Sequence, residues 1–261
     1  MILAKIAKTF FLIVITFVSF NSINAQPTPE ELFQYKEMFT FEVKYSFFKL
    51  GWVDVELLPD TVYNGVLHKY LKTTIRSNSK VPFIGVELDE FHSLFYINDD
   101  GIPVTSKYWK NNVDEAITEE IVYEFDRENN IVYYKEDDGS EGTMEMEEPA
   151  TAGHVIFVFS RLFAGSNISS KQIVYISKNI GYLYFDNPSI TEKRIYKPFD
   201  EPVEAVLTSG RTEDMEGPFG FSGNFRAWFL NDDLRVPLEA RIRVFLGNVI
   251  IRLIDYKKEE L

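Results

Sequence analysis

The stretch that decides the fold is residues 217–257, GPFGFSGNFRAWFLNDDLRVPLEARIRVFLGNVIIRLIDYK. Its middle part, residues 238–244 (LEARIRV), alternates apolar with charged side chains. A period of two is typical of a strand that buries one face and exposes the other. We therefore predict three antiparallel strands at 223–230, 235–245 and 249–256, joined by turns at 231–233 and 246–248.

The same alternation recurs through most of the upstream chain. Turn signals separate the apolar segments: Asn64-Gly65, residues 98–101 (NDDG) and residues 137–139 (DDG). Short strands divided by Asx and Gly turns indicate an antiparallel meander. Residues 27–39 are polar and punctuated by proline, so we expect a lead-in with one helical turn. With no linker or low-complexity segment, the prediction is a single mainly β domain over residues 26–261.

Residues 150–163 (ATAGHVIFVFSRLF) depart from the meander because they are almost continuously apolar. Periodicity alone cannot separate a buried helix from a buried strand in such a run. Thr151 is a suitable N-cap, and Gly165 lies just beyond the end, where helices often stop. We therefore predict the one substantial helix here.

Residues 1–25 have the layout of a signal peptide. Lys5 and Lys8 precede the apolar run 9–20, which is too short to span a membrane as a helix, and we place cleavage after Ala25. Ile23 fits the small-residue cleavage pattern poorly, so an uncleaved anchor is the alternative. The chain has no cysteine for a lipoprotein anchor. We expect a periplasmic or secreted protein without a membrane span after cleavage.

Composition narrows the possible chemistry. The absence of cysteine excludes thiol nucleophiles, thiolate zinc sites and iron–sulfur ligation. The net charge is −13, and loss of two lysines with the signal peptide leaves 25 basic against 40 acidic residues, a net of −15. Such a field repels nucleic acid and anionic headgroups. Nucleic acid is therefore not an expected partner.

Metal and catalytic motifs are not found. His68, His92 and His154 lack the i,i+2 or i,i+4 spacing of a local ligand pair, and the acidic run 136–148 lacks the register of a calcium loop. No G-x-S-x-G, S-x-x-K or H-E-x-x-H pattern occurs. We predict no metal site, no catalytic residues and no cofactor.

The corner formed by Asp232, Asp233, Arg235 and Pro237 is open to two interpretations. Two acids beside an arginine would suit an anionic substrate. Asp also caps turns through backbone amides, and an arginine on the following strand can pair with it. The position between two strongly patterned strands favours a structural corner.

Three features together resemble a known family. They are residues 50–53 (LGWV), the central segment 154–163, and a closing pattern made by Trp228, Asp232, Asp233, Arg235, Pro237, Leu238, Gly247 and Val249. The chain is similar in these to the bacterial exported domain-of-unknown-function family 3108. The segment 151–153 (TAG) departs from that pattern. The resemblance implies a mainly β fold, a strongly curved antiparallel sheet or incomplete β-barrel with one buried α-helix. It implies no activity.

Aromatic residues supply the remaining functional signal. An incompletely closed sheet can leave some of them lining an apolar groove. Our candidate ligand-binding residues are Trp52, Phe157, Trp228 and Arg235. The hypothesis is a non-catalytic envelope protein that binds a lipid or other apolar small molecule, or a partner, on the concave face. A carboxylate-dependent hydrolase and a polysaccharide-binding protein of the periplasm are the alternatives.

The signal peptide gives the first prediction. Because two lysines precede a short apolar run that ends at Ala25, the exported protein is expected to begin at or near Gln26. N-terminal sequencing of the protein recovered from the periplasm measures this. An intact Met1 would favour the uncleaved anchor.

Overall fold

The computed structural model describes residues 26–81, 88–215, 223–244 and 247–260; the predicted signal peptide lies outside them. All sixteen strands of the described ranges belong to one sheet. The first eight strands are β1 (Tyr35–Tyr45), β2 (Phe48–Tyr63), β3 (Val66–Ser77), β4 (Leu88–Ile97), β5 (Pro103–Asn112), β6 (Ile117–Asp126), β7 (Ile131–Lys135) and β8 (Glu141–Glu145). The others are β9 (Ala150–Ala152), β10 (Ser170–Ile176), β11 (Asn179–Asp186), β12 (Thr191–Arg194), β13 (Val203–Glu213), β14 (Asn224–Leu230), β15 (Pro237–Val244) and β16 (Gly247–Glu260).

The sheet grows in both directions from a central pair made by β1 and β16, the first and last of the described strands. One side runs outward from β1 as a meander to β8, and the other runs from β16 through β15, β14, β13, β11 and β10 to β9. Pairing is antiparallel throughout this path except between β9 and β10. Strand β12 pairs with β13 off the main path. The predicted antiparallel meander is confirmed.

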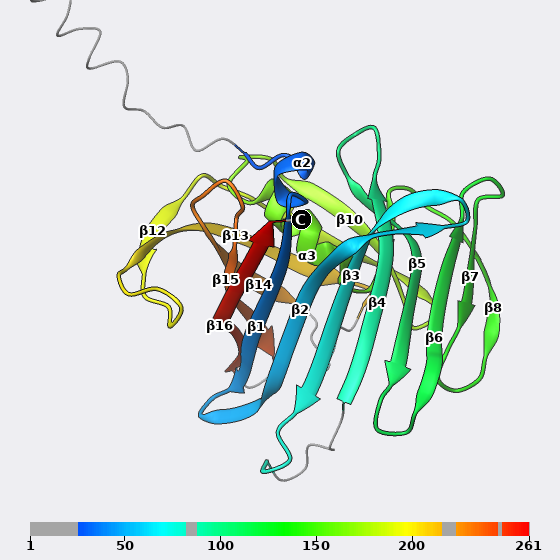
Figure 1. Ribbon diagram of the computed structural model, residues 1–261, viewed down its shortest axis with the longest axis horizontal. Helices are drawn as coiled ribbons and strands as arrows, with labels where there is room; N and C mark the ends of the chain where they lie inside the picture. The colour runs from blue at the N-terminus through cyan, green and yellow to red at the C-terminus, as the bar shows by residue number, and fades with distance from the viewer. Residues whose placement is uncertain (1–25, 82–87, 216–222, 245–246, 261) are drawn as a thin grey trace, which may run out of the picture.

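The two halves of the sheet curl toward each other without closing. Figure 1 shows the strands from β16 to β5 as a curved wall with α3 behind it. Strand β9, at the far end, reaches β5, where the Ala152 amide donates to Thr105 Oγ1 over 3.0 Å. A second core cluster, which includes Tyr123, Val132 and Tyr175, packs β6 and β7 against β10. This arrangement confirms a strongly curved, mainly β fold.

The predicted closing unit is confirmed by β14, β15 and β16. The lead-in is corrected in part, because a short helix α2 (Pro29–Leu32) forms as expected but β1 already begins at Tyr35. Phe39 within this segment is fully buried. The alternation therefore starts earlier than the proline-rich surroundings suggest.

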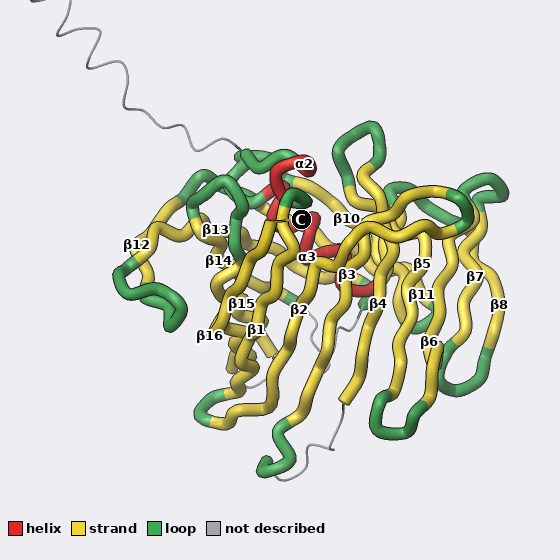
Figure 2. Tube along the Cα trace, in the orientation of Figure 1, coloured by secondary structure: helices red, strands yellow, loops and turns green. Residues whose placement is uncertain are grey.

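The central helix is shorter than predicted. Its apolar run first forms β9, then a 3-10 turn at Gly153–Val155, and only then α3 (Ile156–Phe163). Thr151 is not an N-cap: it lies in β9, and its hydroxyl donates to the Ile173 carbonyl over 2.7 Å. Because β9 can pair with β10, the first residues gain more from sheet hydrogen bonds than from a helical turn. Figure 2 shows how little of the chain is helical.

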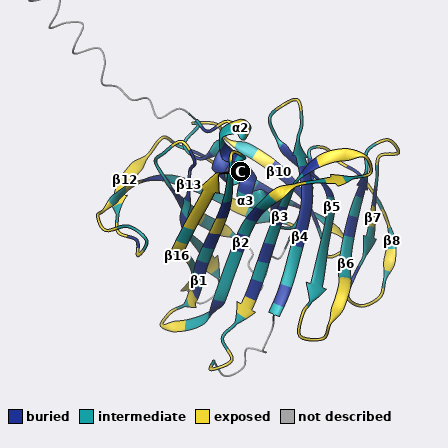
Figure 3. Ribbon diagram, viewed as in Figure 1, coloured by how far each residue is buried: buried dark blue, intermediate teal, exposed yellow. Residues whose placement is uncertain are grey.

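Helix α3 packs into the curve of the sheet. Val158 and Leu162 join the main core with Phe39 and Leu238, whereas Phe159 packs against Phe185 of β11. Figure 3 shows α3 among buried residues, while exposed residues gather at the hairpin ends. The helix thus supplies apolar surface to both halves of the sheet.

A buried ion pair connects this helix to the sheet. The guanidinium of Arg161 binds both oxygens of Glu37 on β1, over 2.7 and 3.1 Å, and neither side chain is exposed. The same guanidinium donates to the Leu234 carbonyl over 3.0 and 2.8 Å. Tyr256 donates to Glu37 over 2.7 Å, and burial together with this carboxylate raises the pKa of the phenol. Every charge in the group therefore has partners.

The second prediction concerns this pair. Replacing Arg161 with Met should lower the free energy of unfolding by about 3–5 kcal/mol, because Glu37 would remain buried without its countercharge. Urea unfolding followed by tryptophan fluorescence measures the loss. The exposed pair Lys257–Asp255 provides the control, and Lys257→Ala should leave the midpoint unchanged. Equal effects of the two variants would contradict a structural role for Arg161.

Candidate functional site

An apolar cavity of about 350 Å³ lies between α3 and the inner face of the curved sheet. Its walls come from both halves of the sheet, with side chains such as Val55 of β2, Leu183 of β11 and Ile251 of β16. Phe157 of α3 forms part of the same wall. Ala227 and Ala240 are cross-strand partners on this wall, so two small side chains meet at one place.

No lysine or arginine lines the cavity among the described residues. Several of its polar side chains already have partners: the Ser160 hydroxyl donates to the Phe157 carbonyl, and the Thr208 hydroxyl donates to Asn187 Oδ1 over 3.1 Å. Glu239 belongs to the cavity wall, but its carboxylate binds arginines. The interior therefore favours an uncharged ligand.

Two polar atoms in the cavity wall have no hydrogen-bond partner within the described part of the chain: Thr73 Oγ1 and His154 Nδ1. Both atoms are enclosed. Phe91 is the cross-strand partner of Thr73, and its ring packs against the imidazole at a centroid distance of 5.0 Å. The two atoms thus lie toward the same side of the cavity. Burial lowers the pKa of His154 to about 4, so the imidazole is neutral at pH 7.

The predicted ligand-binding residues are not brought together at one place. Phe157 and Trp228 are in the cavity wall. Trp52 is next to Val53, a residue of that wall, on β2, so its side chain points to the other face of the strand. Its half-buried ring lies under the cations of Lys49 and Arg76, which are 5.2 and 5.8 Å from the ring centroid. Arg235 lies outside the cavity wall, in the corner between β14 and β15.

Arg235 is buried in that corner. Its guanidinium donates to the Ala164 carbonyl over 3.2 Å, to the Asp232 carbonyl over 2.7 Å and to Asn231 Oδ1 over 3.2 Å. Asp232 Oδ1 accepts from the Leu234 amide over 3.2 Å, and burial raises the pKa of this carboxyl group. Asp233 is exposed, whereas Pro237 contributes to the cavity wall. The contacts of Arg235 join the corner to the end of α3.

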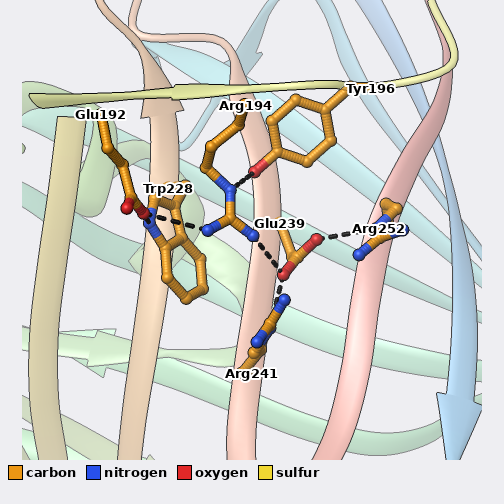
Figure 4. A network of polar contacts seen from close by, with 7 residues as sticks. All are labelled: Glu192, Arg194, Tyr196, Trp228, Glu239, Arg241 and Arg252. Carbon is orange, nitrogen blue, oxygen red and sulfur yellow. Dashed lines mark hydrogen bonds and ion pairs between the residues drawn. The ribbon is translucent and has the colours of Figure 1, made fainter. Parts of the chain in front are cut away.

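A network of arginines covers the opposite face of the same strands (Figure 4). At its centre is Glu239 of β15, whose side chain is fully buried. One oxygen accepts from Arg194 over 2.9 Å and from Arg241 over 2.6 Å, and the other accepts from Arg252 over 2.7 Å. One carboxylate thereby holds three cations from three strands.

Trp228 and Tyr196 extend this network. The Arg194 guanidinium lies 4.1 Å from the Trp228 ring and donates through Nε to the Tyr196 hydroxyl over 2.6 Å. Glu192 accepts from the indole of Trp228 and from Arg194. Burial raises the pKa of Tyr196 to about 12, so the phenol stays protonated. Trp228 thus contacts the network and the cavity wall.

Sequence reasoning did not identify Thr73, His154 or Glu239 as parts of a site. The alternation of residues 239–243 did reveal a polar face, but nothing in the sequence showed that one glutamate binds three arginines.

Within the described residues, no group of three or more His, Asp or Glu side chains is placed to hold a metal ion. No helix in those ranges is long and apolar enough to cross a membrane.

Comparison with known proteins identifies a similar fold. Neither a protein-family model nor a curated protein matches the chain. A solved structure, a beta-barrel-like protein of domain of unknown function 1849 from Brucella abortus, matches with a TM-score of 0.50 and 8% identity, over 87% of this chain and 99% of that one.

Two further solved structures match with lower scores. One is described as an exported protein with a YmcC-like fold from Bacteroides fragilis, with a TM-score of 0.38, 9% identity, and coverage of 85% of this chain and 95% of that one. The other is described as a lipoprotein from Parabacteroides distasonis, with a TM-score of 0.34 and the same identity and coverage. The likeness to the Brucella protein shows that this chain has a beta-barrel-like fold.

Proposed function

We propose that this is an exported, non-catalytic binding protein whose ligand is an apolar molecule with one uncharged polar end. The observation that carries the proposal is the apolar cavity with two enclosed polar atoms, Thr73 Oγ1 and His154 Nδ1, that lack partners among the described residues. A buried polar group without a hydrogen bond costs about 1–3 kcal/mol. A ligand that bonds to these atoms would remove that cost.

A hydroxyl group fits this polar end best. It can donate and accept, so it suits both a threonine hydroxyl and a neutral imidazole. A carboxylate would enter an apolar space without a countercharge, which is strongly unfavourable. We therefore expect a long-chain alcohol, or a molecule with that chemistry, to bind better than the corresponding fatty acid.

The hydrolase alternative has less support. A carboxylate pair needs two acids that face each other across a cleft, so that one keeps a proton. The most buried glutamates, Glu37 and Glu239, are instead bound to arginines. Asp89 is paired with Lys110 at 3.1 Å, and Glu136 accepts a hydrogen bond from Tyr123. These contacts favour stabilising roles for the buried acids.

We assign the predicted site residues accordingly. Phe157 and Trp228 contact the ligand from the cavity wall, and Pro237 supports that wall. Arg235, Asp232 and Asp233 shape the corner between β14 and β15, and Trp52 has no ligand contact in this proposal.

The third prediction tests the cavity. Ala240→Leu should fill the space beside Ala227. The affinity for a neutral fluorescent probe, N-phenyl-1-naphthylamine, should then fall about tenfold or more, and the free energy of unfolding should fall by about 1–3 kcal/mol. Probe fluorescence titration measures the affinity. Val62→Leu, at an exposed position of the β2–β3 hairpin, is the control and should bind normally. Unchanged binding by Ala240→Leu would place the probe elsewhere.

The fourth prediction tests the polar end. Thr73→Val removes a hydroxyl without a partner, so it should raise the free energy of unfolding by about 1 kcal/mol and yet weaken binding of decanol roughly fivefold. Displacement of the fluorescent probe measures the affinity, and binding of decane should not change. Thr208→Val is the matched control, because its hydroxyl already bonds to Asn187: it should lose stability without discriminating decanol from decane. Equal behaviour of the two variants would refute recognition at Thr73.

A further inference from the structure

The sheet face that lies behind the cavity carries an open groove of about 840 Å³. The two faces belong to the same strands, because side chains alternate along each strand. Ala227 and Ala240 line the cavity, whereas Arg226 and Arg241 line the groove. The groove therefore lies on the other face of the sheet from the proposed apolar site, and of the described residues only Phe185, Phe225 and Trp228 line both spaces.

The groove is rich in positive charge, although the whole chain has a net charge of −13. Two carboxylates, Asp186 and Glu192, line it together with five arginines: Arg194, Arg211, Arg226, Arg241 and Arg243. Within the lining this is a surplus of three positive charges. The surplus is local, since the chain as a whole is negatively charged.

Three of these arginines have acidic partners. Glu239 binds Arg194 and Arg241, and Arg211 pairs with Glu213 over 2.6 Å. Arg226 and Arg243 are exposed and have no acidic partner in the described ranges. Two guanidinium groups are thus left for a ligand.

The register of the strands places like charges together. Arg226 of β14 is directly opposite Arg241 of β15, and Arg243 is the next residue of β15 on that face. Like charges directly opposite each other in a sheet are destabilising. Glu239 offsets the charge of Arg241, but Arg226 opposite it and Arg243 beside it have no acidic partner among the described residues, so an anion could bind between the three side chains.

We propose that Arg226, Arg241 and Arg243 bind the phosphate group of a small, hydroxyl-bearing phosphomonoester such as a sugar phosphate. A phosphomonoester carries a charge of about −1.5 to −2 at pH 7, which matches the two unpaired guanidinium groups. Guanidinium groups bind phosphate oxygens through two parallel hydrogen bonds. Glu239 engages Nε of Arg241, which leaves the two Nη groups of that side chain for the ligand.

The remaining groove suits a polar body. Ser209, Asn224 and Asn248 line it and offer hydrogen-bonding groups. Two of the aromatic rings in the lining are already covered by arginines, because Arg194 lies 4.1 Å from the Trp228 ring and Arg211 lies 4.2 Å from the Tyr184 ring. Recognition is therefore expected through hydrogen bonds to hydroxyl groups rather than through stacking.

The charge distribution favours a small ligand over an anionic polymer or membrane. An extended polyanion would approach the acidic remainder of the surface and be repelled by it. A small anion within the groove lies inside the local positive field, which at physiological salt reaches about 8 Å. A pocket of several hundred cubic ångströms is also the usual size for a small-molecule site.

Isothermal titration calorimetry with glucose 6-phosphate at pH 7.5 and low salt tests the proposal. The wild-type protein should bind, and added sodium chloride should weaken binding. The double variant Arg226→Gln/Arg243→Gln should lose affinity about tenfold or more, since each charge-assisted hydrogen bond is worth roughly a tenfold change or more. Its unfolding midpoint should equal or exceed that of the wild type, because like-charge repulsion is removed.

Matched controls distinguish binding in the groove from binding in the cavity and from general attraction of anions to exposed arginines. Arg76→Gln, an exposed arginine on β3 that pairs with Asp54, should bind glucose 6-phosphate normally. Binding of N-phenyl-1-naphthylamine should be unchanged in the double variant, so failure of the cavity proposal and failure of the groove proposal are distinguishable.

Absence of glucose 6-phosphate binding to the wild-type protein, or equal binding of glucose 6-phosphate by the double variant, would overturn the proposal. Equal affinity for glucose, or a preference for phosphatidic acid vesicles over glucose 6-phosphate, would overturn it as well.

Discussion

The structure depends on one buried ion pair, Arg161 with Glu37. A guanidinium without a partner inside the protein would cost several kcal/mol, so the helix is stable only where it meets this carboxylate. That requirement sets α3 against β1 at the centre of the sheet and joins it to the Leu234 carbonyl in the corner after β14. Phe157 lies one helical turn before Arg161, on the same side of α3. The ion pair therefore also orients the aromatic side chain that the helix contributes to the cavity.

The second half of the sheet has two chemically different faces built from the same strands. The pair Ala227–Ala240 lies on the apolar cavity, and the adjoining pair Arg226–Arg241 lies on the groove. A slip of one residue between β14 and β15 would bring charge into the cavity and apolar surface to the groove. The corner held by Arg235 sets this register, because it determines where β15 begins after β14 ends. A structural arginine thus maintains both proposed binding surfaces without contacting either ligand.

Local patterns in the sequence were enough to predict the closing strands, the turn at Asn64-Gly65 and the corner at residues 231–233. They did not predict contacts between distant segments. Glu37 lies in what looked like a polar lead-in, and its partner is 124 residues away. The first residues of the central apolar run form β9 because β10 lies beside them, which no local rule reveals. Thr73 and His154 are ordinary in the sequence, and only the assembled cavity shows that their polar atoms lack partners.

The pairing of β1 with β16 at the middle of the sheet has a consequence for how the chain folds. Tyr35 is opposite Glu260, so the strand that is synthesised first must wait for the last described strand before its second edge is covered. Until then β1 has a free edge, and such edges recruit other chains into mixed sheets. Folding that relies on contacts so distant in sequence is also slow. The nascent chain would therefore benefit from a holding chaperone, even though the finished sheet has no free edge at its centre.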